Sequence, residues 1–161
     1  MFHAISYGWA GPGHPDPERF HLANLAPIIK ARLAWVQSCG LHDIAIFWDF
    51  PSLYQKKTKA GVVDRTDAQK ALFDKGLGAA NYWYGHKLST VWMLTKMPPG
   101  TPHDKQYFER GWPYFECALS NILKEPSMCL DLGAIEDPSK VKIYNSHVAA
   151  VCMTRRLVPP G

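Results

Sequence analysis

Short apolar segments alternate with longer amphipathic ones along most of the chain. Five segments have the length and apolar content of strands: His3–Tyr7, Asp43–Asp49, Ser89–Thr95, Met128–Leu132 and Ser146–Met153. Helical spacing of apolar residues marks three longer segments: Phe20–Ser38, Asp67–Tyr84 and a helix that starts at Pro113. Such alternation is typical of a parallel sheet with crossover helices. We therefore expect one α/β domain over residues 1–161, with a three-layer, flavodoxin-like architecture and a five-stranded, mostly parallel sheet in the order 2-1-3-4-5.

The helix that starts at Pro113 carries the most informative residue of the chain. Proline suits the first helical position, and Glu116 then lies in the first turn, four residues after Trp112. Apolar residues at three- and four-residue spacing define the face that we expect to be buried: Phe115, Leu119 and Ile122. A glutamate at such a position often interacts only with the helix dipole, and this structural role is the alternative to a functional one.

The predicted topology brings several loops to one edge of the sheet. Open α/β sheets bind ligands beyond the carboxyl ends of their strands where the strand order reverses, here between strands one and three. Tyr7, Gly8 and Trp9 lie at the end of strand one, and the long loop 96–111 leads from strand three to Glu116. Asp49, at the end of strand two, is expected at the rim of the same crevice or as a turn or cap residue.

Composition and charge narrow the range of functions. With 161 residues, 47% of them hydrophobic, the chain can bury a single core without a disulfide or a metal. The net charge of +4 comes from scattered basic residues, so nucleic-acid binding is not expected. One basic cluster, Lys56, Lys57 and Lys59 with Arg65, is typical of a solvated loop; the alternative is that it steers an anionic ligand.

The cysteines favour a reducing compartment. Four widely spaced cysteines lie within apolar segments, without a Cys-x-x-Cys pair or a His pair at metal-ligand spacing. We expect buried thiols in a cytoplasmic protein, with no disulfide and no metal site. No signal peptide is visible, and no apolar stretch approaches the roughly 20 residues of a membrane span, so we expect a soluble protein outside the membrane.

Several segments, in order along most of the chain, resemble two similar families of signalling domains. Residues 2–7 (FHAISY) are similar to the first-strand box of Toll-receptor-type (TIR) domains, and residues 4–9 (AISYGW) resemble the opening of fungal heterokaryon-incompatibility (HET) domains. Residues 44–49 (IAIFWD) with 52–55 (SLYQ) are similar to a later HET segment, and 84–86 with 90–94 correspond to a helix end and the third strand. The most specific match is Tyr107-x-x-Arg-Gly-Trp-x-x-x-Glu116, which resembles the HET Tyr-x-x-Arg-x-Trp-x-x-x-Glu box.

The resemblance implies an enzymatic site. In TIR domains the equivalent Trp-x-x-x-Glu supplies the glutamate with which active members cleave the nicotinamide–ribose bond of NAD, so Glu116 is the candidate catalytic residue. NAD is then the substrate, and no resident cofactor is required. The candidate substrate-binding residues are Ser6, Tyr7, Gly8, Trp9, Asp49, Arg110 and Trp112. The resemblance also implies self-association and a role in cell-death or immunity-like signalling.

Two alternatives remain open. The chain can be a non-catalytic TIR/HET-like self-association module in which Trp112 and Glu116 only cap and pack their helix. It can also be a nucleoside-type glycosyl hydrolase or transferase that uses Glu116 on a different base-bearing substrate. An open crevice with Glu116 at its floor favours the enzymes, whereas a filled crevice favours the module.

Overall fold

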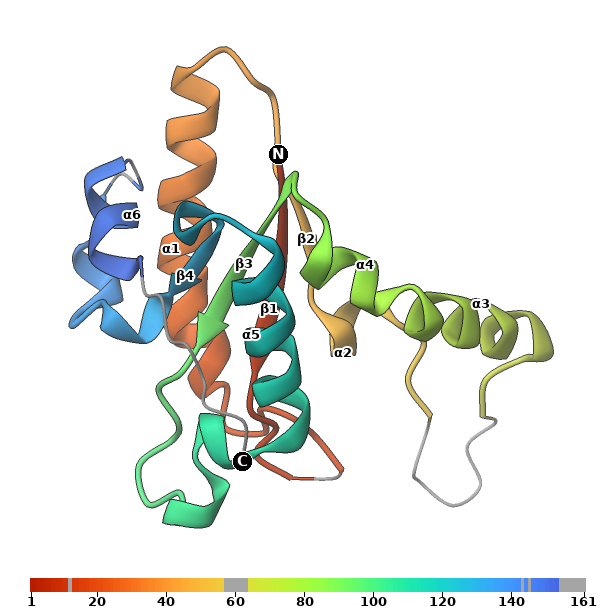
Figure 1. The fold of residues 1–161 in the computed structure, drawn as a ribbon. Helices are drawn as coiled ribbons and strands as arrows, with labels where there is room; N and C mark the ends of the chain where they lie inside the picture. Colours follow the sequence, from red (N-terminus) through yellow and green to blue (C-terminus); the bar gives the residue numbers. More distant parts are fainter. Residues whose placement is uncertain (12, 57–63, 143, 145, 154–161) are drawn as a thin grey trace.

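Four parallel strands form the sheet of the computed structural model, which describes residues 1–11, 13–56, 64–142, 144 and 146–153 (Figure 1). In chain order they are β1 (Phe2–Tyr7), β2 (Ala45–Phe47), β3 (Ser89–Leu94) and β4 (Cys129–Asp131). Their spatial order is β2-β1-β3-β4, with parallel pairing throughout. The prediction that the first strand lies between the second and the third is confirmed.

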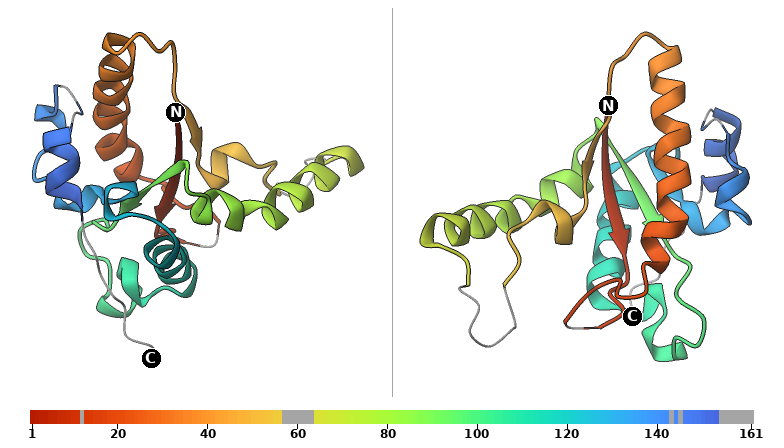
Figure 2. Two further views of the ribbon diagram at one scale, coloured as in Figure 1. Left: turned by 45° about the horizontal axis from the view of Figure 1, so that its top comes forward. Right: turned by 180° about the vertical axis from the view of Figure 1, so that it is seen from behind.

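Helices cover both faces of this sheet (Figure 2). The α-helices are α1 (Phe20–Ser38), α2 (Asp49–Ser52), α3 (Asp67–Gly78), α4 (Ala80–Gly85), α5 (Gly111–Leu123) and α6 (Ser146–Cys152). Single turns of 3₁₀ helix lie in the connections: η1 (His103–Lys105), η2 (Tyr107–Glu109), η3 (Pro126–Met128), η4 (Leu132–Ala134) and η5 (Pro138–Lys140). Helices α1 and α6 lie on one face and α4 and α5 on the other, so the expected α/β class is confirmed.

Alternate side chains of β1 belong to two hydrophobic cores. Ile5 and Tyr7 pack on the α1 side, together with Leu25. Ala4 packs on the other side, together with Tyr84. Successive side chains of a strand point to opposite faces, so both faces of β1 are covered, as is typical of a strand in a parallel sheet.

The fifth strand expected at Ser146–Met153 is not formed. Residues Ser146–Cys152 are helix α6, and Met153 makes an isolated antiparallel bridge to Leu130. A short apolar run does not by itself distinguish strand from helix, and the adjacent alanines 149 and 150 favour the helix. Within the described residues the sheet therefore has four strands in the order 2-1-3-4, and the predicted fifth strand is wrong.

The single helix expected over Asp67–Tyr84 is divided into α3 and α4. The expected cap at Thr66 is present as a reciprocal pair: Thr66 Oγ1 accepts from the Gln69 amide at 3.2 Å, and Gln69 Oε1 accepts from the Thr66 amide at 3.0 Å. Helix α3 has no buried residue and extends away from the sheet (Figure 1). The apolar face expected on this segment is therefore largely exposed, with Leu72 as one example.

The four cysteines, all among the described residues, are in the thiol form. Cys117, Cys129 and Cys152 are buried, as expected, whereas Cys39 is exposed because it follows the last residue of α1. Helix α1 has the bounds that the sequence predicted. No helix in the described part of the chain is long and apolar enough to cross a membrane.

His3 is a titratable group buried inside the sheet. Its ring stacks on Trp92 with the centroids 4.2 Å apart, and neither ring nitrogen has a hydrogen-bond partner among the described residues. Loss of hydration lowers the pKa of His3 to about 3, and the positive charges of Arg32 and of the amino terminus act in the same direction. His3 is therefore neutral in the folded protein at pH 7.

We expect the free energy of unfolding to fall in acid because the folded protein resists protonation of His3. The unfolded chain binds this proton near pH 6.5 and the folded chain near pH 3, so the stability is full above 6.5 and is lost progressively below it. Between pH 6.5 and 4.5 the loss from this residue should be about 2–3 kcal/mol. Urea unfolding at the two pH values should show that the wild type loses more stability than His3→Leu, and that the difference is this amount. Equal losses would contradict the conclusion that His3 is neutral in the folded protein.

Candidate active site

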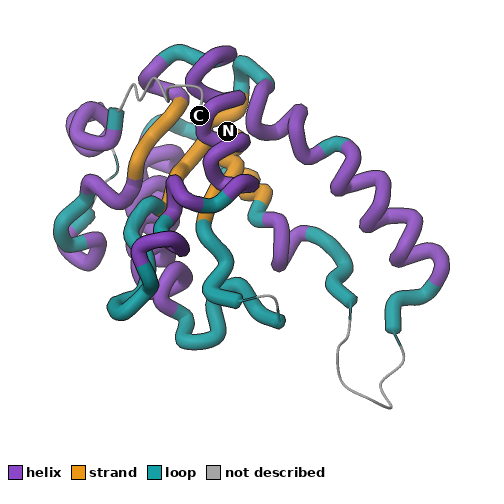
Figure 3. The backbone as a smooth tube through the Cα atoms, turned by 60° about the horizontal axis from the view of Figure 1, so that its bottom comes forward, coloured by secondary structure: helices purple, strands orange, loops and turns teal. Residues whose placement is uncertain are grey.

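The carboxyl ends of β1 and β2 and the first turns of α5 meet at one edge of the sheet, which is the lower edge in Figure 1. Figure 3, in which this edge comes forward, shows loops and short helical turns around the strand ends. A cleft of about 360 Å³ lies here, and its lining is Tyr7, Trp9, Asp49, Tyr84, Arg110, Trp112, Pro113 and Glu116. A hollow of about 150 Å³ shares five of these residues and continues towards α3. The cleft has the size of a small-ligand site.

Most of the candidate residues from the sequence lie around this cleft. Six of them line it: Tyr7, Trp9, Asp49, Arg110, Trp112 and Glu116. Ser6 and Gly8 do not line it. Tyr84 lines the cleft but is not among the residues predicted from the sequence, although it begins one of the family-like segments. Its approach to Glu116 depends on how α4 packs against α5. The pattern of apolar residues does not specify that packing.

Ser6 and Gly8 position neighbouring groups. The buried Ser6 hydroxyl lies 2.7 Å from the Tyr107 hydroxyl. At Gly8, a Cβ atom would lie 2.8 Å from Met97 Sδ and 3.1 Å from Arg110 Cδ. A side chain at Gly8 would therefore press mainly on Met97 and also shift the Arg110 side chain slightly.

Helix α5 begins two residues earlier than the sequence predicted. Arg110 is its extended N-cap and Gly111 its first residue, so Glu116 lies in the second turn and not the first. The buried face is also different: it consists of Pro113, Glu116, Cys117 and Ser120. Phe115 and Ile122 are exposed, at 41% and 79%. Small and polar groups face the sheet, so the helix-dipole role considered for Glu116 does not explain its position.

Ser120 fixes α5 against α4 next to the cleft. Its hydroxyl donates to the Tyr84 carbonyl at 3.1 Å and to the Glu116 carbonyl at 2.7 Å. The Tyr84 hydroxyl in turn donates to the Ile5 carbonyl of β1 at 3.0 Å. These buried hydrogen bonds join α5, α4 and β1 in one frame, so that the backbone of Glu116 has little freedom to move.

Glu116 is only 3% exposed, although its side chain reaches the cleft. Burial raises the pKa of its carboxyl to about 8, and the nearby polar groups of Ser6, Tyr84 and Trp112 oppose this increase only in part. The negative charge of Asp49 adds to the increase. Glu116 therefore titrates within the physiological range, as is common for residues that carry out acid, base or electrostatic catalysis.

Asp49 is the second carboxyl group of the cleft and the first residue of α2. Trp9 Nε1 donates to its Oδ2 at 3.2 Å, and the Phe50 amide donates to its Oδ1 at 2.6 Å. Burial raises the pKa of Asp49, and contacts with Tyr7, Phe50 and Trp9 reduce the increase. The strand expected to end at Asp49 ends at Phe47, so the carboxylate is held by a short helix.

Two tryptophans contribute to the lining of the cleft. Trp112 is 52% exposed and stacks on Phe115, with the ring centroids 5.6 Å apart. Trp9 meets Phe50 edge to face at 5.7 Å. Because half of Trp112 is in contact with solvent, its indole face is available to a flat ligand.

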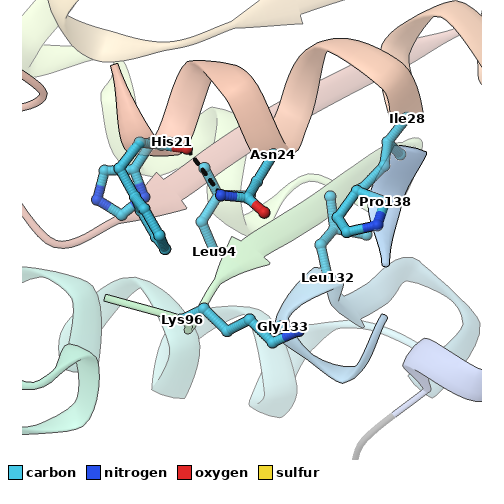
Figure 4. A pocket seen from close by; sticks show the side chains of 9 residues that line it. His21, Asn24, Ile28, Leu94, Lys96, Leu132, Gly133 and Pro138 are labelled. Atoms are coloured by element: carbon cyan, nitrogen blue, oxygen red, sulfur yellow. Dashed lines mark hydrogen bonds between the residues drawn. The ribbon is translucent and has the colours of Figure 1, made fainter. Parts of the chain in front are cut away.

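A separate and much smaller cavity lies under α1, on the face of the sheet away from α5 (Figure 4). His21, Leu94 and Lys96 are among its lining residues, and its volume is only about 20 Å³. This space is too small for a nucleotide.

The basic cluster considered from the sequence contributes little to the described cleft. Lys57 and Lys59 lie outside the described residues. The Arg65 guanidinium lies 4.3 Å from the centroid of the Phe73 ring and donates to the Tyr54 carbonyl at 3.2 Å. Arg110 is therefore the cation that lines the cleft in the described part of the chain.

Comparison with protein-family models, curated proteins and solved structures finds no match for this chain. Among the described residues, no three His, Cys, Asp or Glu side chains are grouped so that they could hold a metal ion.

We expect Glu116→Gln to be more stable than wild type at neutral pH. The folded pKa of about 8 lies above the usual 4.5, so the stability of the wild type is full below pH 4.5 and decreases as the pH rises towards 8. Glutamine does not ionise, and its advantage should grow to at least about 1 kcal/mol between pH 5 and 8. Thermal unfolding of both proteins measures this difference.

The matched control is Glu109→Gln, the same change at an exposed position in η2. Its melting temperature should follow that of the wild type at both pH values. If Glu116→Gln has no growing advantage, Glu116 is not the buried acid described above.

Proposed function

We propose that this protein hydrolyses the nicotinamide–ribose bond of NAD or of a related nucleotide, with Glu116 as the catalytic residue. The observation that carries the proposal is a buried carboxyl group that borders an open cleft, whose lining also includes two tryptophans and an arginine. An open cleft of this kind favours an enzyme over a module in which the crevice is filled. We place the activity in TIR/HET-like cell-death or immunity-like signalling, on the motif resemblance alone.

The chemistry requires few groups. The C1′–N bond breaks with both electrons passing to the pyridinium ring, which leaves as neutral nicotinamide. The ribosyl group develops positive charge at C1′, which the Glu116 carboxylate stabilises electrostatically or by a transient ester bond. Water then adds to C1′ and releases a proton. No acid is needed for the leaving group, because the ring is cationic before the bond breaks.

The high pKa of Glu116 couples its ionisation to substrate binding. A cationic ring near the carboxyl favours the ionised form, so binding of the nicotinamide ring and loss of the proton assist each other. In the free protein, with a pKa of about 8, much of the carboxyl is protonated at pH 7. The charge is thus fully developed only when the cationic substrate is present.

The other cleft residues suit the rest of the substrate. Trp112, half-exposed at the cleft, offers a stacking surface for the nicotinamide ring, and Trp9 is a second aromatic residue in the lining. Arg110 uses its Nε to donate to the Lys105 carbonyl at 2.7 Å, which orients the guanidinium group beside the cleft. A guanidinium group is well suited to pair with phosphate oxygens.

We expect the wild-type protein to release nicotinamide from NAD, and Glu116→Gln to lower kcat/KM by about 100- to 1000-fold. Below pH 8, kcat/KM of the wild type should rise about tenfold per pH unit and then level, because the free enzyme must lose the proton of Glu116. The kcat profile should level at a lower pH, because the bound cation lowers this pKa. Chromatographic assay of nicotinamide between pH 5 and 9 checks both profiles.

Glu109→Gln is again the control and should retain wild-type activity, because this exposed carboxylate does not line the cleft. Equal activity of folded Glu116→Gln and wild type would remove Glu116 from the mechanism.

We also propose that the protein self-associates, from the exposed apolar residues of α3, α4 and α5: Leu72, Leu77, Tyr82 and Ile122. Activity assays at protein concentrations a hundredfold apart test this proposal.

The raised pKa of Glu116 also favours a second candidate, a nucleoside-type hydrolase or transferase. A neutral purine or pyrimidine base leaves more readily when it is protonated, and a carboxyl group with a pKa of about 8 can donate that proton at pH 7. The pH profile would then be reversed, with activity falling above pH 8. If the protein is inactive on both substrate classes at every concentration, the non-catalytic module is the correct reading.

A further inference from the structure

A second hollow, of about 380 Å³, lies beside the candidate active site. It is formed by the loop before α1 and by the segment that follows β2. Aromatic side chains and one cation are prominent in its lining: Tyr7, His14, Trp48, Phe50 and Arg19. It is as large as the cleft of Glu116, and each of the two has the volume of a site for one half of a dinucleotide.

The two hollows are separated by a layer of aromatic rings. Tyr7 lines both of them. Trp9 lines the first and Phe50 the second, and these two rings touch edge to face with centroids 5.7 Å apart. The Tyr7 hydroxyl lies near Asp49 and Trp48 but has no hydrogen-bond partner within the described residues. Two adjacent hollows with aromatic linings suit a molecule that has two flat rings joined by a flexible link.

Arg19 has an unusual backbone conformation at the second hollow. Among the described residues it is the only one besides glycine with a positive φ, which is 58°. A residue with a Cβ atom adopts this left-handed conformation at a cost. The start of α1 does not require the Arg19 side chain, because Asp16 accepts from the amides of His21 at 3.1 Å and Leu22 at 2.9 Å.

The charges around the aromatic layer suit a diphosphate. Arg110 lines the hollow on one side and Arg19 the hollow on the other. Asp16, the carboxylate of the second hollow, is occupied by the two amides of α1, which offset its negative charge. Guanidinium groups pair well with phosphate oxygens, so one in each hollow suits a diphosphate that links two halves of a ligand. The Asp49 carboxyl, which accepts from Trp9 Nε1, is the opposing group, and burial raises its pKa and so favours its neutral form.

We infer that the second hollow binds the adenosine half of a dinucleotide, with the base against Phe50 and His14 and the diphosphate between Arg19 and Arg110. This inference rests on the proposed function, because the nicotinamide half occupies the cleft of Glu116. It deepens that function by assigning a place to the second half of the substrate, so that the protein should act on dinucleotides in preference to nicotinamide riboside, which lacks the phosphates and the second ring.

Arg19→Gly is the variant that tests the inference most directly. Glycine adopts a positive φ without strain, so the fold should be retained. The ratio of kcat/KM for NAD to that for nicotinamide riboside should fall about 10- to 100-fold, the usual effect of losing a charged hydrogen bond. Arg19→Asn, which also tolerates this conformation, should behave in the same way. Lys30→Ala, which removes an exposed positive charge from α1, should leave the ratio unchanged.

A binding measurement separates this inference from the proposed activity. ADP is titrated by calorimetry into Glu116→Gln, with and without Arg19→Gly. The inference is supported if Glu116→Gln binds ADP and the added Arg19→Gly change weakens this binding about 10- to 100-fold, whether or not the wild type cleaves NAD. No binding of ADP in the millimolar range, or equal binding by both proteins, overturns it. Equal kcat/KM of the wild type for NAD and for nicotinamide riboside also overturns it but leaves the proposed function intact, whereas cleavage of neither substrate defeats the proposed function alone.

Discussion

The burial of one carboxyl group, that of Glu116, is the constraint on which the candidate site depends. The group is almost inaccessible to water, yet it borders an open cleft. Desolvation favours the neutral acid, and the nearby polar groups of Ser6, Tyr84 and Trp112 only partly offset this preference. A protein gains no stability from an acid held in this way. For a site that must stabilise a positive charge the arrangement is useful, because the carboxyl group then ionises mainly when the cationic ligand is bound.

The fold supplies the rigidity that such a group requires. Strand β1 is covered on both faces, and through the Ile5 carbonyl it receives the hydroxyl of Tyr84. Ser120 then connects Tyr84 to the backbone of Glu116. The central strand, α4 and α5 thus form one packed unit at the cleft, and Trp112 is a more exposed residue of its lining. Preorganisation of this kind is what electrostatic catalysis needs.

Sequence analysis predicted the features that depend on apolar content and strand order. The first four strands, their order and helix α1 follow from local patterns that the tertiary structure reinforces, and the order placed Tyr7, Asp49 and Glu116 at one edge. The errors lie where packing decides. Residues 146–152 are short and apolar enough to suit a strand or a helix. In α5 the apolar Phe115 and Ile122 face solvent, while Glu116 and Ser120 face the sheet, which no rule of periodicity anticipates. The altered pKa of Glu116 depends on burial and could not be derived from the sequence.

The ionisation of Glu116 can be observed directly. In protein labelled with ¹³C at the glutamate carboxyl groups, the signal of Glu116 is the one that Glu116→Gln lacks. Its chemical shift should titrate with a midpoint near pH 8 in the free protein. Saturating 1-methylnicotinamide, a cationic ring without a ribose, should move the midpoint to lower pH, and neutral nicotinamide should lower it less or not at all. A midpoint near the usual 4.5, or one that does not respond to the cation, would contradict the central claim that this cleft develops its charge against a cationic substrate.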